Sequence, residues 1–282
     1  MNTSEGLSGG GPVAVLGSGK MGEILARGIA RAGLVPAGAI YLTDIDARRV
    51  QALVDQHGFS SKPSNPEAVA AAPIVLLAVK PQDLGSVLEE IAPGIGAQHL
   101  IISIAAGITT RFIDDRLPSG PAVVRAMPNA ASGVGEGITA ICGGANAREE
   151  HLDVAERLLT GVGKVLRVAE PYIDAVTAVS GSGPAYFALF AEAMVDAGVT
   201  VGLSRAVASE LVIQTLAGTA AMMSRGGMRP AEVREAVTSP AGTTSMALAE
   251  LERSGVRAAV LNAVQAALDR SKAMSGEPSR KT

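Results

Sequence analysis

The sequence predicts an α/β protein: an N-terminal domain built on a mostly parallel sheet, followed by an all-helical domain. Two observations support this prediction. Up to about residue 170, short apolar segments rich in β-branched residues alternate with segments whose apolar residues recur every three or four positions. This alternation is typical of a parallel sheet covered by helices on both faces. Beyond that point only the helical pattern continues.

The expected strands of the first domain are 13–16, 40–43, 74–79, 100–104, 122–127 and 164–168. The expected helices of the second domain are 184–197, 205–224, 245–253 and 256–274. The expected divisions are a flexible tail at 1–11, a dinucleotide-binding domain at 12–170, a helical domain at 171–275 and a second tail at 276–282. Helices 184–197 and 205–224 are apolar on nearly every side, so we expect a second copy of the chain to cover them.

Composition narrows the class of protein. The net charge of −3 leaves no extended basic surface, so nucleic acid is not an expected partner. The single cysteine, Cys142, excludes an internal disulfide, is expected in the core, and fits a reducing cytoplasm. His57, His99 and His151 lack the spacing of metal ligands, so no metal is expected. No signal peptide is recognised, and no uninterrupted apolar run suggests a membrane partner.

A glycine-rich loop is the first candidate site. Gly17-x-Gly19-x-x-Gly22 directly follows strand 13–16 and opens a helix. The first glycine permits a tight turn, the second lets a pyrophosphate approach the backbone, and the third lets helix pack on strand. We therefore expect a nicotinamide dinucleotide here, because backbone N–H groups at a helix start bind phosphate. The expected cofactor-binding residues of the loop are Gly17, Ser18, Gly19, Lys20, Met21 and Gly22.

The end of the second strand bears on which cofactor binds. Asp44 stands where an acidic residue usually holds the ribose 2′-hydroxyl of NAD, and it would repel the 2′-phosphate of NADP. Asp46 adds to that repulsion if it faces the site. Arg48 and Arg49 follow, and they either pair with a phosphate or form a solvated helix face. We predict that NADH is used well and leave NADPH open.

Two further strand ends carry small residues. In an open α/β sheet, ligands lie outside the carboxyl ends of the strands, so these ends are expected to meet the cofactor. Lys80 has an alternative role as a structural cap. The expected cofactor contacts here are Ala78, Val79, Lys80, Pro81, Ser103, Ala105, Ala106 and Gly107.

The helical half contains a second candidate helix start, in "SPAGTT" (239–244). Free N–H groups at the start of a helix can bind a carboxylate, and a threonine hydroxyl can reach a substrate nitrogen or oxygen. Simple N-capping by Ser or Thr is an equally good interpretation of the residues alone.

The stretch "AVSGSGPAYF" (178–187) interrupts a helical pattern with Ser, Gly and Pro. Pro184 suits the first turn of a helix, and Ser180 or Ser182 could cap it. Gly181 and Gly183 remove side chains where another group must come close.

Four motifs occur together in the order found in pyrroline-5-carboxylate reductases, and the chain resembles that family over nearly its whole length. The motifs are the glycine loop, "AVKPQ" (78–82), "MPNAASGVGEG" (127–137) and the helical segment "SGSGPAY" (180–186), which is followed by "SPAGTT". The resemblance implies a Rossmann-like domain and a helical dimerisation domain, often in larger rings such as decamers. It implies NADPH or NADH as cofactor and 1-pyrroline-5-carboxylate as substrate.

The resemblance also implies roles for matching positions. Asn65 lies near the adenosine ribose, and Ser180 helps to shape the site. Met127, Pro128 and Asn129 lie between cofactor and substrate. The N–H groups of Thr243 and Thr244, at the helix start that Gly242 opens, bind the substrate carboxylate, and the Thr244 hydroxyl, the candidate catalytic group, meets the ring nitrogen.

Two departures from the family pattern are expected to matter. Ala241 replaces a usual glycine and so should avoid positive φ, and Asp44 is absent from many members.

Three alternatives are weighed against this function. A hydroxyacid dehydrogenase would need a catalytic lysine, but there is no Lys between Lys164 and Lys272. An imine reductase for another cyclic substrate is an alternative that the residues do not exclude. A non-catalytic NAD(P) sensor would keep the glycine loop without needing "SPAGTT".

Overall fold

The chain divides into two compact units in the computed structural model, which describes residues 11–118 and 120–274. Unit 1 extends to Ser182 and takes in the residues from Ala267 onward, and unit 2 is Gly183–Ala266. The expected tails at 1–11 and 276–282 lie outside the described residues, apart from residue 11. Unit 1 is therefore formed from two segments of the chain, and unit 2 is connected to it at two points.

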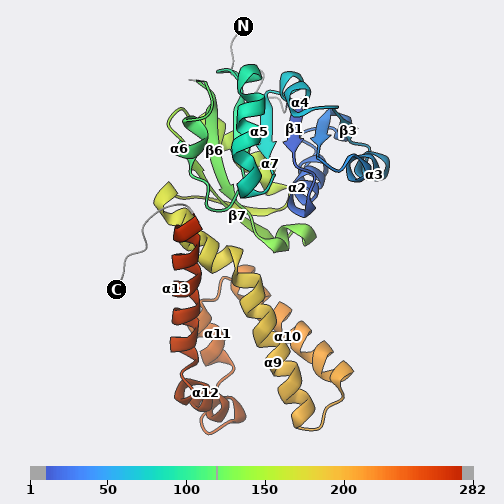
Figure 1. Ribbon diagram of the computed structural model, residues 1–282. Helices are drawn as coiled ribbons and strands as arrows, with labels where there is room; N and C mark the ends of the chain where they lie inside the picture. Colours follow the sequence, from blue (N-terminus) through green and yellow to red (C-terminus); the bar gives the residue numbers. More distant parts are fainter. Residues whose placement is uncertain (1–10, 119, 275–282) are drawn as a thin grey trace. The chain divides into compact units, whose positions relative to one another are not determined.

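Unit 1 is built on an eight-stranded sheet in the order β3-β2-β1-β4-β5-β6-β7-β8 (Figure 1). The strands are β1 Val13–Leu16, β2 Ile40–Thr43, β3 Ser60–Ser61, β4 Ile74–Leu77, β5 Leu100–Ser103, β6 Ala122–Met127, β7 Gly137–Gly143 and β8 Gly163–Arg167. Neighbouring strands are parallel except β6 and β7, which are antiparallel. The mostly parallel sheet is confirmed.

Two strands were not predicted from the sequence. β3 has only two residues, and β7 is bounded by glycines and follows a motif that was interpreted as part of a site. The predicted strands 74–79 and 100–104 end earlier, at Leu77 and Ser103, because the chain turns there into loops.

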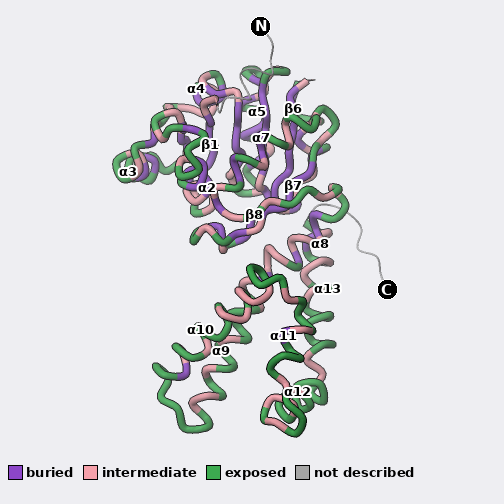
Figure 2. The backbone as a smooth tube through the Cα atoms, turned by 180° about the vertical axis from the view of Figure 1, so that it is seen from behind, coloured by how far each residue is buried: buried purple, intermediate pink, exposed green. Residues whose placement is uncertain are grey.

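Helices cover both faces of the sheet. The helices of unit 1 are α2 Lys20–Arg31, α3 Ala47–His57, α4 Asn65–Ala71, α5 Leu84–Ile91, α6 Thr110–Asp114, α7 Glu149–Thr160 and α8 Ile173–Val176. Alternate strand residues point to opposite faces, so Val13 and Val15 join a core with α2, α3 and α7. Ala14 and Leu16 join another with α4, α5 and α6. Figure 2 shows the strands as the most buried part of the chain.

The order of the strands creates a switch point between β1 and β4. From β1 the chain moves outward to β2 and β3, and it then returns to the other side of β1 as β4. The loops that leave the carboxyl ends of β1 and β4 therefore lead away in opposite directions along the sheet. In folds of this kind, the crevice outside these strand ends is the ligand site.

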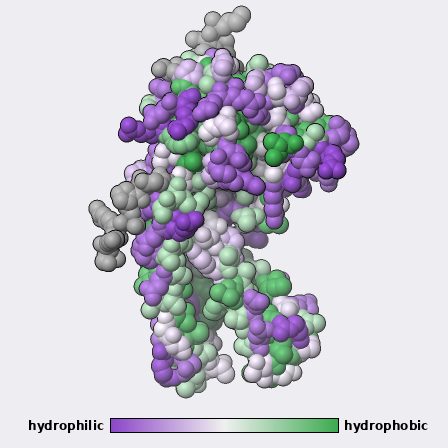
Figure 3. Space-filling model, viewed as in Figure 1, coloured by the Kyte–Doolittle hydropathy of each residue, from purple (hydrophilic) through white to green (hydrophobic). Residues whose placement is uncertain are grey.

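Unit 2 consists of long helices with extensive exposed apolar surface. Its helices are α9 Gly183–Thr200, α10 Arg205–Ser224, α11 Pro230–Ala236, α12 Thr243–Arg253 and the larger part of α13 Val256–Met274. α9 packs against α10. Figure 3 shows apolar side chains on the surface of these helices. The exposed apolar side chains include Phe187, Leu189, Phe190, Val207, Leu211, Ile213, Met246, Val260 and Leu261.

One helix among the described residues, α10, is long and apolar enough to cross a membrane by length and composition alone. The sequence has no uninterrupted apolar run at α10, because Arg205 and Glu210 lie near the start of the helix. Only 11% of its most apolar stretch is buried. The surface of α10 therefore requires a cover, either lipid or another protein surface.

Candidate functional site

The three glycines of the loop between β1 and α2 have different structural roles. Gly17 has φ +95°, and a Cβ there would lie 2.8 Å from the main chain of Ala78. A Cβ on Gly22 would clash with the carbonyl oxygen of Gly17. By contrast, a Cβ on Gly19 would meet no protein atom within 4 Å. Gly17 and Gly22 are thus required by the packing of the loop on β4, whereas Gly19 borders open space that a ligand can occupy.

The first turn of α2 begins at Gly19 without a side-chain cap. Gly19 has an extended backbone, φ −60° and ψ 178°, and provides no side chain to bond the free N–H groups that follow. The first N–H groups of a helix lack partners within it and attract anions. The open space beside Gly19 and the uncapped helix start together fit a dinucleotide pyrophosphate.

Asp44 is tied to the glycine loop. Its Oδ2 accepts a hydrogen bond of 2.7 Å from the Ser18 N–H, and its Oδ1 accepts one of 3.0 Å from the Asp46 N–H. Ser18 is fully buried, and its hydroxyl donates to the Thr43 carbonyl oxygen. A carboxylate oxygen can accept more than one hydrogen bond, so Asp44 remains able to accept from a ribose hydroxyl.

The other charged residues beyond β2 have structural partners. Asp46 caps α3 by accepting hydrogen bonds from the N–H groups of Arg48 and Arg49. The Arg49 guanidinium donates to the Ser18 carbonyl oxygen at 2.5 Å and lies 3.5 Å from Glu23. Arg48 and Arg49 were expected either to pair with a phosphate or to form a solvated helix face. Arg49 instead holds the glycine loop, and the side chain of Arg48 is exposed.

Asn65 is held at the first residue of α4. Its Oδ1 accepts a hydrogen bond of 2.6 Å from the Thr43 hydroxyl, and its Nδ2 donates to Glu90 at 2.7 Å. Thr43 is the last residue of β2. The structure thus brings Asn65 to the carboxyl end of β2, against Thr43, the residue before Asp44.

The loops after β4 and β5 lie at neighbouring strand ends. The Ala78 N–H donates to the Leu16 carbonyl oxygen, and the Ile104 N–H donates to the Leu77 carbonyl oxygen. Lys80 lies just before a 3-10 turn at Pro81–Asp83, which its carbonyl oxygen helps to close, while its side chain is exposed. The residues Ala78 to Pro81 and Ser103 to Gly107 therefore follow strand ends on the same edge of the sheet as the glycine loop.

Asn129 connects β6 to the segment that leads into unit 2. Its Nδ2 donates to the Ser180 carbonyl oxygen at 3.2 Å, and its Oδ1 accepts from the Ile138 N–H at 3.2 Å. Ser180 lies in a π-helical turn, Thr177–Gly181, where a Cβ on Gly181 would be 3.1 Å from Met127 Cε. The "AVSGSGPAYF" stretch is thus a π-turn followed by α9, with Pro184 in the first turn of that helix.

The hydroxyl of Ser180 donates to the Val176 carbonyl oxygen at 3.1 Å. It bonds back into the preceding turn and does not cap α9. A side chain at 181 would crowd the end of the Met127 side chain, which approaches the backbone there.

The second candidate helix start lies within unit 2. α12 begins after Gly242, which has φ −76°, ψ 170° and no side-chain cap. The Ser245 hydroxyl donates to the Gly242 carbonyl oxygen at 2.8 Å, which leaves it pointing away from the free N–H groups. The expectation that Ala241 avoids positive φ is wrong: its φ is +57°. The loop places an alanine in a left-handed turn.

Cys142 is a buried core residue, as predicted. Burial raises the pKa of its thiol to about 12, and the nearby Glu170 carboxylate adds to the effect. At neutral pH the thiol is therefore un-ionised and unsuited to nucleophilic chemistry. Within the described residues, no cluster of His, Cys, Asp or Glu could hold a metal ion.

The structure brings together the predicted cofactor residues of unit 1 at adjoining strand ends. The residues of the "SPAGTT" loop belong to unit 2, so they form a separate cluster. Sequence reasoning missed Thr43, which orients Asn65, and Arg125, a buried arginine in β6. The signal for Arg125 was present, since "AVVRAM" carries one charge in an otherwise apolar strand.

Comparisons with known proteins identify relatives over both units. Residues 170–274 match the family model for pyrroline-5-carboxylate reductase dimerisation, and residues 12–107 match the model for NADP oxidoreductase, coenzyme F420-dependent. A pyrroline-5-carboxylate reductase of Corynebacterium melassecola is 42% identical, over 92% of this chain and 97% of its own length.

Solved structures agree with these matches. A pyrroline-5-carboxylate reductase from Coxiella burnetii superposes with a TM-score of 0.89 at 32% identity, over 94% of this chain and 98% of that one. The pyrroline carboxylate reductase of Plasmodium falciparum, solved with NADP bound, gives a TM-score of 0.84 at 32% identity, with the same coverage. The match of residues 170–274 to a dimerisation model favours a protein cover for the apolar helices.

Proposed function

The chain belongs to the pyrroline-5-carboxylate reductase family, and we propose that it reduces 1-pyrroline-5-carboxylate to L-proline with NAD(P)H through two anion-binding helix starts. The observation that carries this proposal is that α2 and α12 begin in the same way. In each helix the N-cap residue is a glycine, and no side chain bonds the first N–H groups. Side chains of Asp, Ser or Thr cap α3, α4, α6 and α10, while α5 and α8 also lack a side-chain cap but do not begin at a glycine. An uncapped first turn keeps its N–H groups for a ligand.

The cofactor residues follow from the crevice of unit 1. The N–H groups after Gly19 would hold the pyrophosphate, and Asp44 and Asn65 would hold the adenosine ribose. The strand ends at 78–81 and 103–107 would border the second ribose and the nicotinamide. When bound, the reduced nicotinamide supplies a hydride to the imine carbon. Because Asp44 faces the loop as a carboxylate, we propose that NADH is used well and that NADPH is accepted.

The substrate residues follow from the α12 start. The N–H groups of Thr243 and Thr244, at the positive end of α12, would bind the substrate carboxylate without an arginine. The Thr244 hydroxyl would accept a hydrogen bond from the protonated ring nitrogen, the form of the imine that is more electrophilic. Met127, Pro128, Asn129 and Ser180 would shape the floor of the site.

Catalysis in this scheme depends on placement. The imine is already an electrophile, so the protein needs no nucleophile; it must fix the carboxylate and hold the C=N carbon close to the reductant. Positioning two reactants can supply several kcal/mol of the barrier, about 7 in well-oriented cases. This fits a site made of backbone N–H groups, small residues and one threonine.

The chain self-associates through its helical region, which matches the dimerisation model. We propose a homodimer in which a second copy covers the apolar faces of α9, α10 and α13, and further assembly into a ring such as a decamer. We also propose that the enzyme works in the cytoplasm, with no nucleic-acid or membrane partner. Light scattering at fixed chain concentration tests the assembly, and a monomer contradicts it.

One assay tests the activity directly. Oxidation of NADH and of NADPH is followed with 1-pyrroline-5-carboxylate, with piperideine carboxylates and with hydroxy acids. The proposal expects the highest kcat/KM with pyrroline-5-carboxylate. A higher value with a six-membered imine would identify an imine reductase of another specificity, and no turnover with any of them would indicate a binding protein.

The role of Thr244 is tested by substitution. Thr244→Ala is expected to lower kcat/KM for pyrroline-5-carboxylate about tenfold or more, equivalent to about 1.4 kcal/mol, while Thr244→Ser restores most of it. Thr200→Ala is the matched control, because the Thr200 hydroxyl only bonds back to Asp196 at the end of α9. Unchanged kinetics in Thr244→Ala would remove this hydroxyl from the mechanism.

A further inference from the structure

Two segments connect unit 2 to unit 1, and they are tied to each other by a buried hydrogen bond. The first stem, α8 with the π-turn, ends at the junction Ser182–Gly183, and the second stem is the last part of α13, from Ala267 onward. The Ser271 hydroxyl of the second stem donates to Asp174 Oδ1 of the first at 2.7 Å. Both residues are 6% exposed. The chain therefore enters and leaves unit 2 through a pair of stems that are clamped together.

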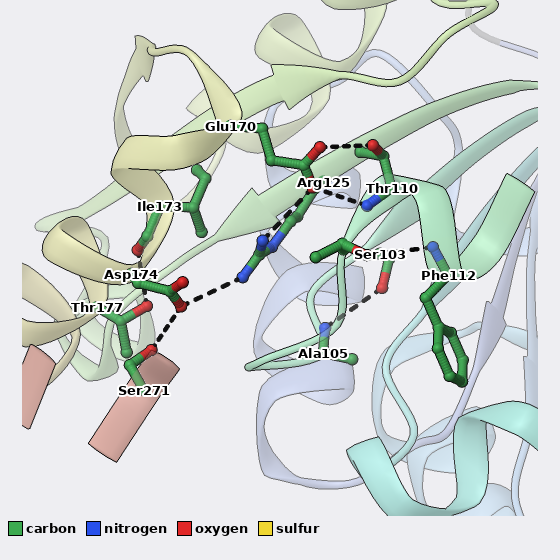
Figure 4. A network of polar contacts seen from close by, with 11 residues as sticks. Ser103, Ala105, Thr110, Phe112, Arg125, Glu170, Ile173, Asp174, Thr177 and Ser271 are labelled. Atoms are coloured by element: carbon green, nitrogen blue, oxygen red, sulfur yellow. Dashed lines mark hydrogen bonds and ion pairs between the residues drawn. The ribbon is translucent and has the colours of Figure 1, made fainter. Parts of the chain in front are cut away.

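Arg125 ties this clamp to the sheet. It lies in β6, is 3% exposed, and faces two carboxylates (Figure 4). Its Nη1 is 3.4 Å from Glu170 Oε1, and its Nη2 is 3.7 Å from Asp174 Oδ1. Glu170 also accepts hydrogen bonds from the N–H and the hydroxyl of Thr110, at 2.7 and 2.6 Å. The Arg125 guanidinium thus joins β6 to Asp174 of the first stem and to Glu170, and Glu170 makes the link to α6.

The same stems touch the loops proposed to border the cofactor. Gly107 has φ +73°, and a Cβ there would lie 3.0 Å from Met274 Cβ at the end of the second stem. On the other side, Asn129 bonds Ser180 in the π-turn of the first stem. Arg125 stands two residues before Met127 in the strand that leads to Asn129. Loops at the cofactor crevice and both stems are therefore parts of one connected structure.

Stability alone is a poor explanation for this arrangement. A buried arginine must lose its hydration, and the ion pairs at 3.4 and 3.7 Å are longer than the roughly 2.8 Å of a strong charged hydrogen bond. Arg125 Nη2 is also buried without a hydrogen bond among the described residues. Apolar side chains at this point would pack at lower cost, but they would not fix the direction of the stems. Directional contacts are what a positioning role requires.

We propose that Arg125 is a positioning residue that, with Glu170, Asp174 and Ser271, locks the two stems of unit 2 to the part of the sheet that borders the cofactor crevice. This inference rests on the proposed function, in which the substrate is held by α12 in unit 2 and the cofactor by unit 1. The stems set how reproducibly the substrate is placed against the cofactor, whether that cofactor is bound to the same chain or to a second copy. Loosening them lowers kcat for the imine and leaves cofactor affinity unchanged.

Three variants and one control test the proposal in the full chain. Ser271→Ala removes the bond between the stems, Thr110→Val removes one bond to Glu170, and Arg125→Lys keeps the charge while losing the planar fork. Thr160→Val is the control, because the Thr160 hydroxyl bonds only to Glu156 within α7. For each variant, kcat and KM for pyrroline-5-carboxylate, the Kd for NADPH, and amide hydrogen exchange without cofactor are measured.

The expected result separates positioning from stability. Ser271→Ala lowers kcat about tenfold and Arg125→Lys about a hundredfold, while the Kd for NADPH changes by less than about twofold. Hydrogen exchange becomes faster in residues 173–182 and 267–274 in these two variants and in Thr110→Val, but not in Thr160→Val.

Two outcomes would overturn the proposal. In one, kcat in Ser271→Ala and Arg125→Lys equals that of the natural chain. In the other, kcat falls only in proportion to cofactor affinity, and exchange rises uniformly over unit 1. If the natural chain does not turn over pyrroline-5-carboxylate, the proposed function fails, and the exchange measurement still decides whether the clamp exists.

Discussion

α2 and α12 begin in the same way, but the surroundings of the two helix starts differ. Both helices begin at a glycine with an extended backbone and no side-chain cap. The α2 start follows a fully buried strand, and its loop presses against the main chain of Ala78. The α12 start follows an exposed turn in which Ala241 has φ +57°, and Met246 in its first turn is 68% exposed.

The two proposed anion sites are thus built in different ways. At α2, the burial of β1 and β4 fixes the loop, so the site is complete within unit 1. At α12, the loop is held by local bonds such as that from the Gly242 N–H to the Ser239 carbonyl oxygen. Its surroundings include apolar side chains that a second copy would cover. The first site is therefore expected to be sensitive to packing, and the second to the conformation of a few residues.

The largest expected effect is at the α2 start. In Gly22→Ala, the new Cβ clashes with the Gly17 carbonyl oxygen, so the loop must shift, and kcat/KM for NAD(P)H is expected to fall by about a hundredfold or more. Gly19→Ala meets no protein atom within 4 Å, so it should keep the melting temperature while still weakening cofactor binding about tenfold.

Gly38→Ala is the matched control, because a Cβ there also meets nothing within 4 Å and lies away from the loop. Steady-state kinetics and thermal unfolding of the three variants distinguish the two causes. If Gly19→Ala binds the cofactor as well as Gly38→Ala does, the open space beside Gly19 is not the pyrophosphate site.

A smaller effect is expected from the charge that faces the same loop. Asp44→Asn removes the charge but keeps an oxygen to accept the Ser18 N–H bond. With the repulsion of a 2′-phosphate gone, the ratio of kcat/KM for NADPH to that for NADH is expected to rise about tenfold, or about 1.4 kcal/mol. Asp46→Asn is the control, since Asp46 caps α3 and is exposed. A larger change in that control would move the selectivity from Asp44 to Asp46.

The sequence predicted the local structure of the α2 start well because its determinants are local. A strand, three glycines and a helix pattern follow one another, and each glycine has a function that spacing alone reveals. The acid at 44 was equally visible. The sequence did not show that Asp46 caps α3 or that Arg49 braces the loop, because both roles depend on distances between separate elements.

The residues around the stems were harder to predict for the same reason. Arg125 meets Glu170 and Asp174, which lie 45 and 49 residues further along the chain, and no local pattern joins them. β7 was missed because its antiparallel pairing with β6 follows a glycine-rich motif. The conformation of Ala241 was predicted wrongly, since the steric preference of an alanine was assumed to outweigh the shape that the loop requires.

The smallest expected effect lies at the α12 start and has a definite sign. An alanine at φ +57° is strained by about 1–2 kcal/mol relative to glycine, so replacing it with glycine removes that strain. Part of the gain in stability is lost because glycine also gives the unfolded chain more conformational freedom. Ala241→Gly is therefore expected to stabilise the protein by up to about 1 kcal/mol. Because glycine adopts the same φ, the loop keeps its shape, and kcat/KM stays within about twofold.

Ala247→Gly, in the same helix, is expected to change the stability in the opposite direction. Ala247 is exposed in α12, where glycine costs about 1 kcal/mol relative to alanine. Denaturant unfolding at a fixed chain concentration compares the two, because association contributes to the measured stability. If both variants lose stability equally, Ala241 is not strained in solution, and the α12 loop has a relaxed shape without the left-handed turn.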